Sequence, residues 1–256
     1  MTNTIGIDLG SRSVKRVVLD ETGQIVSTHI DDTLYFYKTF GVLKAGHFSL
    51  DISRLNILPE DRVVSTGYGK HQIIIHGVTR ISEQKAHVLG AIHQTGLQDF
   101  VLVDIGGQDT KVIGVRSGQI LDVHMNDKCG ASSGRYLENM ANVLSISLDE
   151  LGRHYEDPLD IASTCAIFGE SEVLGRFFEG QPLARILAGI NLSVVRRVEH
   201  QIRSFPSYPI VLVGGVAKNL AIKRSLSREM NVEVIVPDLP QFNGAIGAAK
   251  ISLPLL

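Results

Sequence analysis

Two stretches of the sequence, each with an aspartate and a glycine-containing turn, repeat one another ninety-six positions apart. The residues that recur in register are an aspartate, a glycine and a lysine: Asp8, Gly10 and Lys15 in the first copy, and Asp104, Gly106 and Lys111 in the second. Glycine and serine in a turn allow backbone N–H groups to close around phosphate oxygens, and a lysine adds a positive point charge. The repeat therefore predicts two phosphate-binding turns that bind a nucleotide.

A third glycine-rich stretch lies downstream, where an apolar run that follows Pro209 enters Gly214-Gly215 and then a predicted helix. Paired glycines at such a junction allow adenine and ribose to approach the backbone, and the helix N-terminus faces the phosphates. The three stretches together supply the candidates for nucleotide binding: Gly10, Ser11, Arg12, Ser13, Lys15, Gly106, Gly107, Thr110, Lys111, Gly214, Gly215, Val216 and Asn219.

The catalytic candidates are acidic or amide side chains in or beside the two turns: Asp8, Asp104, Gln108 and Asp109. Asp8 and Asp104 lie at the ends of predicted strands, where they are placed to hold Mg²⁺ directly or through its water ligands. Gln108 and Asp109 are placed to orient or deprotonate an attacking water. The sequence leaves open which of these two residues acts on the water.

Cys129 and Cys165 each precede a predicted helical segment and have polar, glycine-rich neighbours. A thiolate at a helix N-terminus is stabilised by the helix dipole and by the free N–H groups, which favours a role as a metal ligand. Two thiolates are too few for a [4Fe–4S] cluster, which four cysteines normally hold, but a homodimer supplies four. A zinc ion shared across a dimer satisfies the same count.

Each copy of the repeat predicts a strand–turn–strand–turn–strand unit, so we expect two similar subdomains. The first lobe is expected to comprise residues 1–95 and 241–256, and the second residues 96–240 with both cysteines. This arrangement resembles the superfamily of actin, sugar kinases and heat-shock chaperone ATPases. The resemblance implies an α/β, actin-like ATPase with ribonuclease-H-like duplicated lobes and a nucleotide cleft between two subdomains. Small residues over 242–249 suit close helix packing, either under a hinge or in an ordinary core.

Composition excludes several other classes of protein. The chain has 256 residues, a formal net charge of −2 and no basic block, which disfavours nucleic acid as a partner. No apolar run approaches the about 20 residues that a membrane-spanning helix needs. The N-terminus lacks the features of a secretion signal, and two cysteines are too few for a disulfide scaffold. We therefore expect a cytoplasmic protein without a membrane partner.

Six motifs distributed over nearly the whole chain together resemble one family. They are Gly6–Ser11, Ser65–Lys70, Asp104–Lys111, Asn126–Cys129, Ser163–Cys165 with Glu170–Glu172, and Gly214–Asn219. The chain resembles the BadF/BadG/BcrA/BcrD-type ATPases, the ATP-dependent activators (archerases) of 2-hydroxyacyl-CoA dehydratases. Related proteins are the ATPase subunits of benzoyl-CoA reductase and the reductases of double-cubane-cluster proteins.

The resemblance implies a homodimer with one [4Fe–4S] cluster at its interface, ligated by Cys129 and Cys165 of both subunits. It implies that binding and hydrolysis of MgATP, with ADP as product, drive a low-potential electron onto a separate iron–sulfur protein. The implied electron acceptor is a dehydratase or a double-cubane-cluster protein, and the implied electron donor is ferredoxin or flavodoxin.

Three departures from the family pattern leave the partner open: Gly130–Gly134 after the first cysteine, Gln84-Lys85, and Gly169. His87 could couple the lobes or contact a partner, and the simpler interpretation is a histidine on a helix surface. Two other functions compete with the electron donor. One is a small-molecule kinase with Asp104 or Asp109 as general base, and the other is a nucleotide-dependent regulatory module whose cysteines are inert or bind zinc.

Overall fold

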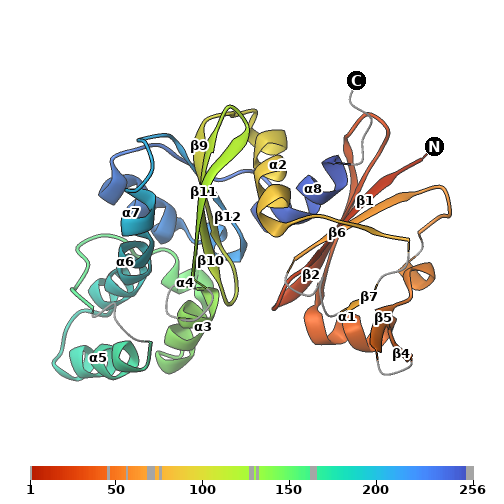
Figure 1. Cartoon of the computed structure of the whole chain (residues 1–256). Coiled ribbons are helices and arrows are strands. Elements are labelled where there is room, and N and C mark those ends of the chain that lie inside the picture. The colour runs from red at the N-terminus through yellow and green to blue at the C-terminus, as the bar shows by residue number, and fades with distance from the viewer. Residues whose placement is uncertain are drawn as a thin grey trace. The chain divides into compact units, whose positions relative to one another are not determined.

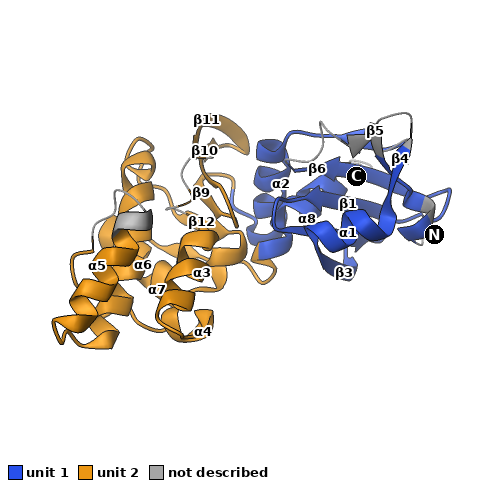
Figure 2. Cartoon of the chain, turned by 90° about the horizontal axis from the view of Figure 1, so that it is seen from below, with its two compact units in different colours: residues 1–97, 241–256 blue, residues 98–240 orange. Residues whose placement is uncertain are grey.

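The computed structural model describes residues 2–44, 47–55, 57–67, 73–74, 77–126, 130, 133–161 and 166–251. Cys129 and Cys165 lie outside these residues. The chain divides into two compact units, Met1–Leu97 with Gln241–Leu256, and Gln98–Pro240, shown in separate colours in Figure 2. The first unit thus contains both ends of the chain, and the second is one continuous stretch.

The first unit is built on a five-stranded sheet with the order β3-β2-β1-β6-β8 (Figure 1). Its strands are β1 (Thr4–Leu9), β2 (Ser13–Leu19), β3 (Ile25–Asp32), β6 (Arg62–Thr66) and β8 (Thr79–Arg80). A smaller sheet contains β4 (Gly41–Lys44), β5 (His47–Leu50) and β7 (Ile73–Ile74). The helices are α1 (Thr33–Phe40), α2 (Glu83–Thr95) and α8 (Asn243–Lys250), with 3-10 turns at Ile52–Leu55 and Pro240–Phe242.

Glycine and alanine allow α8 to lie directly against β1 and α2. A Cβ added at Gly6 of β1 would overlap the carbonyl oxygen of Ala245, and one at Gly247 would overlap that of Ala86. The backbones therefore approach more closely than any larger side chain permits. The close packing predicted for the small residues of the last helix is confirmed by these contacts.

The second unit has its own five-stranded sheet, with the order β11-β10-β9-β12-β13. Its strands are β9 (Phe100–Ile105), β10 (Thr110–Arg116), β11 (Gln119–Asn126), β12 (Ile210–Val213) and β13 (Val234–Ile235). The helices are α3 (Gly134–Val143), α4 (Leu148–Leu151), α5 (Ala166–Phe178), α6 (Leu183–Ile202) and α7 (Leu220–Met230), with a 3-10 turn at Gly215–Lys218. The helices predicted after the two cysteines are present as α3 and α5.

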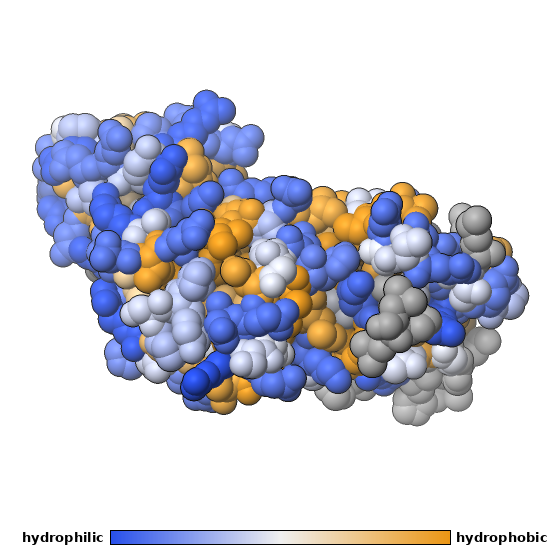
Figure 3. Space-filling model, turned by 90° about the horizontal axis from the view of Figure 1, so that it is seen from above, coloured by the Kyte–Doolittle hydropathy of each residue, from blue (hydrophilic) through white to orange (hydrophobic). Residues whose placement is uncertain are grey.

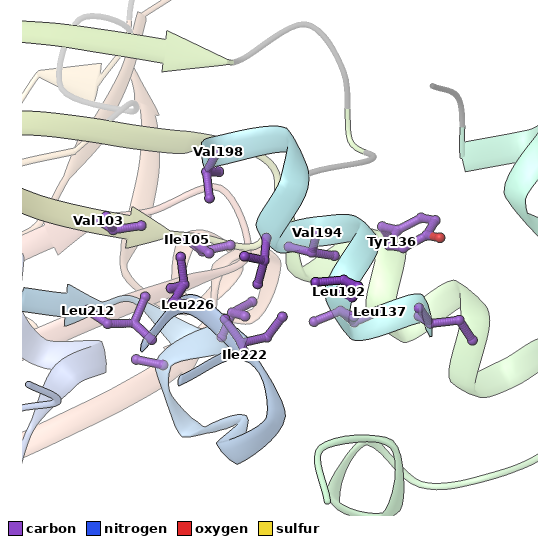
Figure 4. Close-up of a cluster of buried hydrophobic side chains, with 14 of the residues drawn as sticks. Val103, Ile105, Tyr136, Leu137, Leu192, Val194, Val198, Leu212, Ile222 and Leu226 are labelled. Carbon is purple, nitrogen blue, oxygen red and sulfur yellow. The ribbon is translucent and has the colours of Figure 1, made fainter. Parts of the chain in front are cut away.

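The core of the second unit lies between the sheet and its helices. Every residue of β9 and β12 is buried, as expected for central strands that are covered on both faces. Figure 4 shows side chains of β9 and β12 with those of α6 and α7, among them Val103, Leu212, Val198 and Leu226. These contacts hold the central strands, and hence their carboxyl ends, at fixed positions.

The two sheets share one topology. In each, an antiparallel three-stranded unit is followed by a strand parallel to its first strand: β6 beside β1, and β12 beside β9. The strand–turn–strand–turn–strand units predicted from the repeat are thus confirmed as β1–β3 and β9–β11.

No helix in the described part of the chain combines the length and apolar character needed to cross a membrane. On the face in Figure 3, hydrophobic side chains are interspersed with hydrophilic ones.

The close packing of α8 predicts that substitution by alanine has opposite effects on stability at two helical glycines. We expect Gly247→Ala to lower the free energy of unfolding by about 1–3 kcal/mol, because the added methyl group displaces the backbone of α2. Gly175→Ala is the control, since a Cβ at this exposed position of α5 meets nothing within 4 Å. It should stabilise by up to about 1 kcal/mol. Urea unfolding measures both variants, and equal effects would contradict the packing argument.

Candidate nucleotide site

The first predicted phosphate turn joins β1 to β2. Asp8 lies directly opposite Lys15 in the antiparallel register, with Nζ of Lys15 4.0 Å from Oδ2 of Asp8. A Cβ at Gly10 would lie only 2.7 Å from the carbonyl oxygen of Ser13 and 3.0 Å from Nζ of Lys15, so this turn requires glycine. The remaining predicted residues of the turn are polar and exposed or half-buried: Ser11, Arg12 and Ser13.

Asp8 is buried, and its carboxylate lacks a partner on one side. Only 5% of the residue is exposed, and Oδ1 has no hydrogen-bond partner within the described residues. Glycines stand beside both oxygens: a Cβ at Gly67 would lie 2.8 Å from Oδ1, and one at Gly244 would lie 3.0 Å from Oδ2. Burial and the negative charge of Asp8 raise the pKa of Tyr37 to about 12, so that hydroxyl stays protonated near the carboxylate.

The second turn joins β9 to β10. Its aspartate and lysine face one another as in the first turn, but its lysine pairs with two carboxylates and not with one. Asp104 lies opposite Lys111, whose Nζ is 3.7 Å from Oδ2 of Asp104 and also pairs closely with Asp109. Lys111 is fully buried, whereas the side chain of Lys15 is 17% exposed. Lys111 is therefore paired with two carboxylates of its own turn, and Lys15 is the lysine better placed to offer charge to a phosphate.

The other residues of the second turn differ in accessibility. The Gly106 amide donates to the carbonyl oxygen of Asp109 over 2.9 Å and closes the turn. Thr110 is buried, Gly107 is half-buried and Gln108 is exposed. Of the two residues predicted to orient water, Asp109 is thus paired with Lys111, while Gln108 lies at the surface.

The third glycine-rich stretch follows β12, which runs parallel to β9. Gly214 has a φ of +87°, and a Cβ there would overlap the carbonyl group of Ile105 and the carboxylate of Asp104. Gly214 therefore lies against the end of β9 that carries Asp104. The next residue, Gly215, is exposed, and Val216 is buried.

The helix expected directly after Gly214-Gly215 begins later than the sequence analysis places it. A single 3-10 turn intervenes, and α7 starts only at Leu220. Oδ1 of Asn219 accepts from the amide of Ile222 over 3.0 Å, and its Nδ2 donates to Oδ1 of Asn191 over 2.9 Å. Asn219 thus caps α7, and its role in binding a cofactor stays a prediction.

Residues at the N-terminus of a helix donate hydrogen bonds to the carbonyl groups of each predicted phosphate turn. In the first unit, Thr33 of α1 donates through Oγ1 to the carbonyl oxygen of Gly10 over 2.8 Å. In the second, the amide of Gly134 in α3 donates to the carbonyl oxygen of Gly106 over 2.8 Å, and Arg135 donates to that of Gly107 over 3.0 Å. The sequence analysis does not predict these contacts, because no residue pattern within either turn signals them.

The two units differ in how their third strand connects to the helix that contacts the turn. In the first unit α1 begins at the residue after β3, whereas in the second seven residues separate the end of β11 from the start of α3. This interval contains Cys129. The residues between β11 and α3, here called the cysteine segment, therefore connect the third strand of the second unit to the helix that donates hydrogen bonds to its predicted phosphate turn.

The interpretation of His87 as a residue on a helix surface is wrong. Only 5% of the residue is exposed. Its face of α2 is covered by α8, whose Asn243 donates through Nδ2 to the carbonyl oxygen of His87 over 2.8 Å. The small residues at this helix contact bring the backbones close enough to enclose the imidazole.

Comparison with known proteins agrees with this geometry. The model of the BadF/BadG/BcrA/BcrD ATPase family matches residues 5–252. The chain belongs to this family. It is an ATPase, and ATP is its nucleotide.

Relatives in this family match along nearly their whole length. The chain is 36% identical over 252 residues to the 2-hydroxyisocaproyl-CoA dehydratase activator of Clostridioides difficile, covering 96% of this chain and 93% of the relative. It is 34% identical over 258 residues to the (R)-2-hydroxyglutaryl-CoA dehydratase activating ATPase of Acidaminococcus fermentans, covering 96% and 95%. Neither protein is named as a small-molecule kinase, the first alternative considered above.

A solved member of the family confirms the predicted fold. The activator of the 2-hydroxyisocaproyl-CoA dehydratase from Clostridium difficile, with bound ADPNP, matches with a TM-score of 0.84 and 33% identity. The match covers 98% of this chain and 94% of that one. The chain is therefore an α/β, actin-like ATPase.

Lys111 pairs with two carboxylates and Lys15 with one, so their substitution is expected to affect stability and ATP binding differently. We expect Lys111→Met to lower the free energy of unfolding by about 3–5 kcal/mol, because it removes the cation beside the buried carboxylate of Asp104. Lys15→Met should cost less, about 1–2 kcal/mol, because Lys15 is partly exposed and lies 4.0 Å from a single carboxylate, and it should weaken ATP binding about tenfold. Urea unfolding and titration with a fluorescent ATP analogue measure both effects. Equal destabilisation by the two substitutions would contradict the assignment.

Proposed function

We propose that this protein is an ATP-dependent electron donor that activates a 2-hydroxyacyl-CoA dehydratase or a related iron–sulfur enzyme. The observation that carries the proposal is the similarity over 96% of the chain to two activators of such dehydratases. The expected cytoplasmic setting supports it, because a reducing compartment preserves free cysteine thiolates.

The surroundings of Asp8 fit a hydrated Mg²⁺ ion bound with the nucleotide. A buried carboxylate oxygen without a partner is costly, and a metal-bound water would donate the missing hydrogen bond to Oδ1 of Asp8. When bound, Mg²⁺ neutralises negative charge on the phosphates. Lys15 then adds a positive charge from the same hairpin, and the turn at Gly10 presents backbone N–H groups to the phosphate oxygens.

The second turn presents a similar set of polar groups within its own unit. Lys111 holds Asp104 and Asp109 in one arrangement, and Gly214 allows the backbone to pass beside Asp104. Gln108 extends from this turn as an exposed side chain and is the better placed of the two candidates to orient the attacking water.

Cys129 and Cys165 from two subunits would provide the four thiolates that a [4Fe–4S] cluster requires. The cluster supplies a one-electron carrier. The helix that follows Cys129 donates its first amides to the turn at Gly106 and Gly107, so a hydrogen-bonded connection runs from the nucleotide turn toward the cysteine segment. We propose that changes at the turn reach the segment by this route.

The proposal predicts the metal content of the protein. Purified without oxygen, it should be brown and contain about four iron atoms per dimer by mass and elemental analysis. Cys129→Ser should lose the iron but retain ATP binding, since the substitution leaves both phosphate turns intact. A colourless protein that contains zinc in place of iron would favour the regulatory alternative.

Activation of a partner tests the function itself. We expect a purified iron–sulfur 2-hydroxyacyl-CoA dehydratase to become active only with this protein, MgATP and reduced ferredoxin or flavodoxin together. Cys129→Ser is the matched control, which should hydrolyse ATP without activating the partner. Phosphorylation of a small-molecule substrate, with no transfer of electrons to any iron–sulfur protein, would overturn the proposal.

A further inference from the structure

His87 is a buried polar side chain to which the proposed function assigns no role. It lies in the first turns of α2, and Asn243 at the start of α8 covers it. Asn243 is fully buried, and its amide group has a fixed orientation: Oδ1 accepts from Nε2 of Gln94 over 2.9 Å, and Nδ2 donates to the carbonyl oxygen of His87 over 2.8 Å.

This orientation determines which imidazole nitrogen carries the proton. Nδ2 of Asn243 also lies 3.4 Å from Nδ1 of His87. Because Nδ2 is a donor, Nδ1 must act as the acceptor, so in the neutral ring the proton resides on Nε2. The amide of Asn243 therefore fixes the tautomer of the neutral ring, with its N–H at Nε2.

Nε2 of His87 faces two carboxylates of the same unit. Oε1 of Glu83, one helical turn earlier, is 4.0 Å away. On the other side, a Cβ at Gly244 would lie 3.0 Å from Nε2 of His87 and 3.0 Å from Oδ2 of Asp8. The two side chains are thus no more than twice that distance apart, and Gly244 lies beside both of them. One water molecule can bridge polar groups at such a separation.

We propose that His87 is a positioning residue for Asp8. Its Nε2–H, oriented by Asn243, donates toward the Asp8 carboxylate and directs Oδ1 toward the Mg²⁺ hydration shell. The inference rests on the proposed role of Asp8 in holding Mg²⁺. Outer-shell donors of this kind orient metal-binding side chains, and their loss commonly weakens metal binding about 10–100-fold.

A pair of amide substitutions separates this role from packing. In His87→Gln the side-chain amide reaches the place of Nε2 and can donate there, whereas in His87→Asn it reaches only the place of Nδ1. Titration of a fluorescent ATP analogue, with excess EDTA and with increasing Mg²⁺, reports metal-free and metal-dependent affinity separately. We expect the Asn variant to need about 10–100-fold more Mg²⁺ with unchanged metal-free affinity, and the Gln variant to remain close to the parent.

A second substitution leaves both side chains in place. Gly244→Ala would put a methyl group between His87 and Asp8, and it should raise the Mg²⁺ requirement as His87→Asn does. Thermal unfolding checks that each variant is folded.

The outcomes separate a failure of the Mg²⁺ assignment at Asp8 from a failure of the role proposed for His87. If the parent shows no effect of Mg²⁺ on nucleotide binding, the assignment of Asp8 to the metal fails, and this inference fails with it. If the parent shows the effect and both folded variants, His87→Asn and Gly244→Ala, keep it, only the role of His87 is overturned. Equal weakening in His87→Gln and His87→Asn would indicate packing and would also overturn it.

Discussion

Each of the two units buries one carboxylate at the end of a central strand, and the surrounding residues compensate the charge of that carboxylate. Asp8 and Asp104 are 5% and 4% exposed, and burial of an ionised carboxylate is costly unless cations or donors compensate it. The antiparallel register provides the first compensation, since it sets a lysine directly opposite each aspartate. That arrangement requires a tight turn between the two strands. In the first hairpin this turn has room only for glycine at the position of Gly10. A tight turn leaves carbonyl groups that need donors, and the N-termini of α1 and α3 supply them.

The two halves keep this geometry but divide the charge differently. Lys111 is committed to two carboxylates of its own hairpin, whereas Lys15 approaches one and remains partly exposed. The lysine of the second hairpin is thus engaged within its own turn, whereas the lysine of the first hairpin is the better placed of the two to meet a phosphate. A second difference is the connection to the supporting helix, which is direct in the first half and contains Cys129 in the second. The duplicated element has therefore retained its backbone while its side chains and connections have become specialised.

The sequence predicts those features that depend on local spacing. The repeat of aspartate, glycine and lysine predicts two hairpins with these residues in register, because the strand period fixes which residues face one another. Burial of His87 was missed, since it depends on a helix contributed by residues more than 150 positions later in the chain. The sequence predicts a helix directly after Gly214-Gly215, but α7 starts only at Leu220 because Asn219, which is predicted to bind the nucleotide, caps its N-terminus. The attachment of helix N-termini to the turns depends on tertiary packing that no local pattern encodes.

The position of α8 in the chain links the nucleotide site to completion of the first unit. β1 and α2 lie near the N-terminus, yet the helix that packs against both is made only after the whole second unit. Contacts of such high sequence separation close a long loop, and this closure carries an entropic cost that contacts within one hairpin avoid. Gly244 stands beside the Asp8 carboxylate, and Asn243 of the same helix orients His87. The surroundings of Asp8 are therefore complete only once the C-terminal helix has docked, so the proposed Mg²⁺ and nucleotide site at Asp8 depends on residues from both ends of the first unit's sequence.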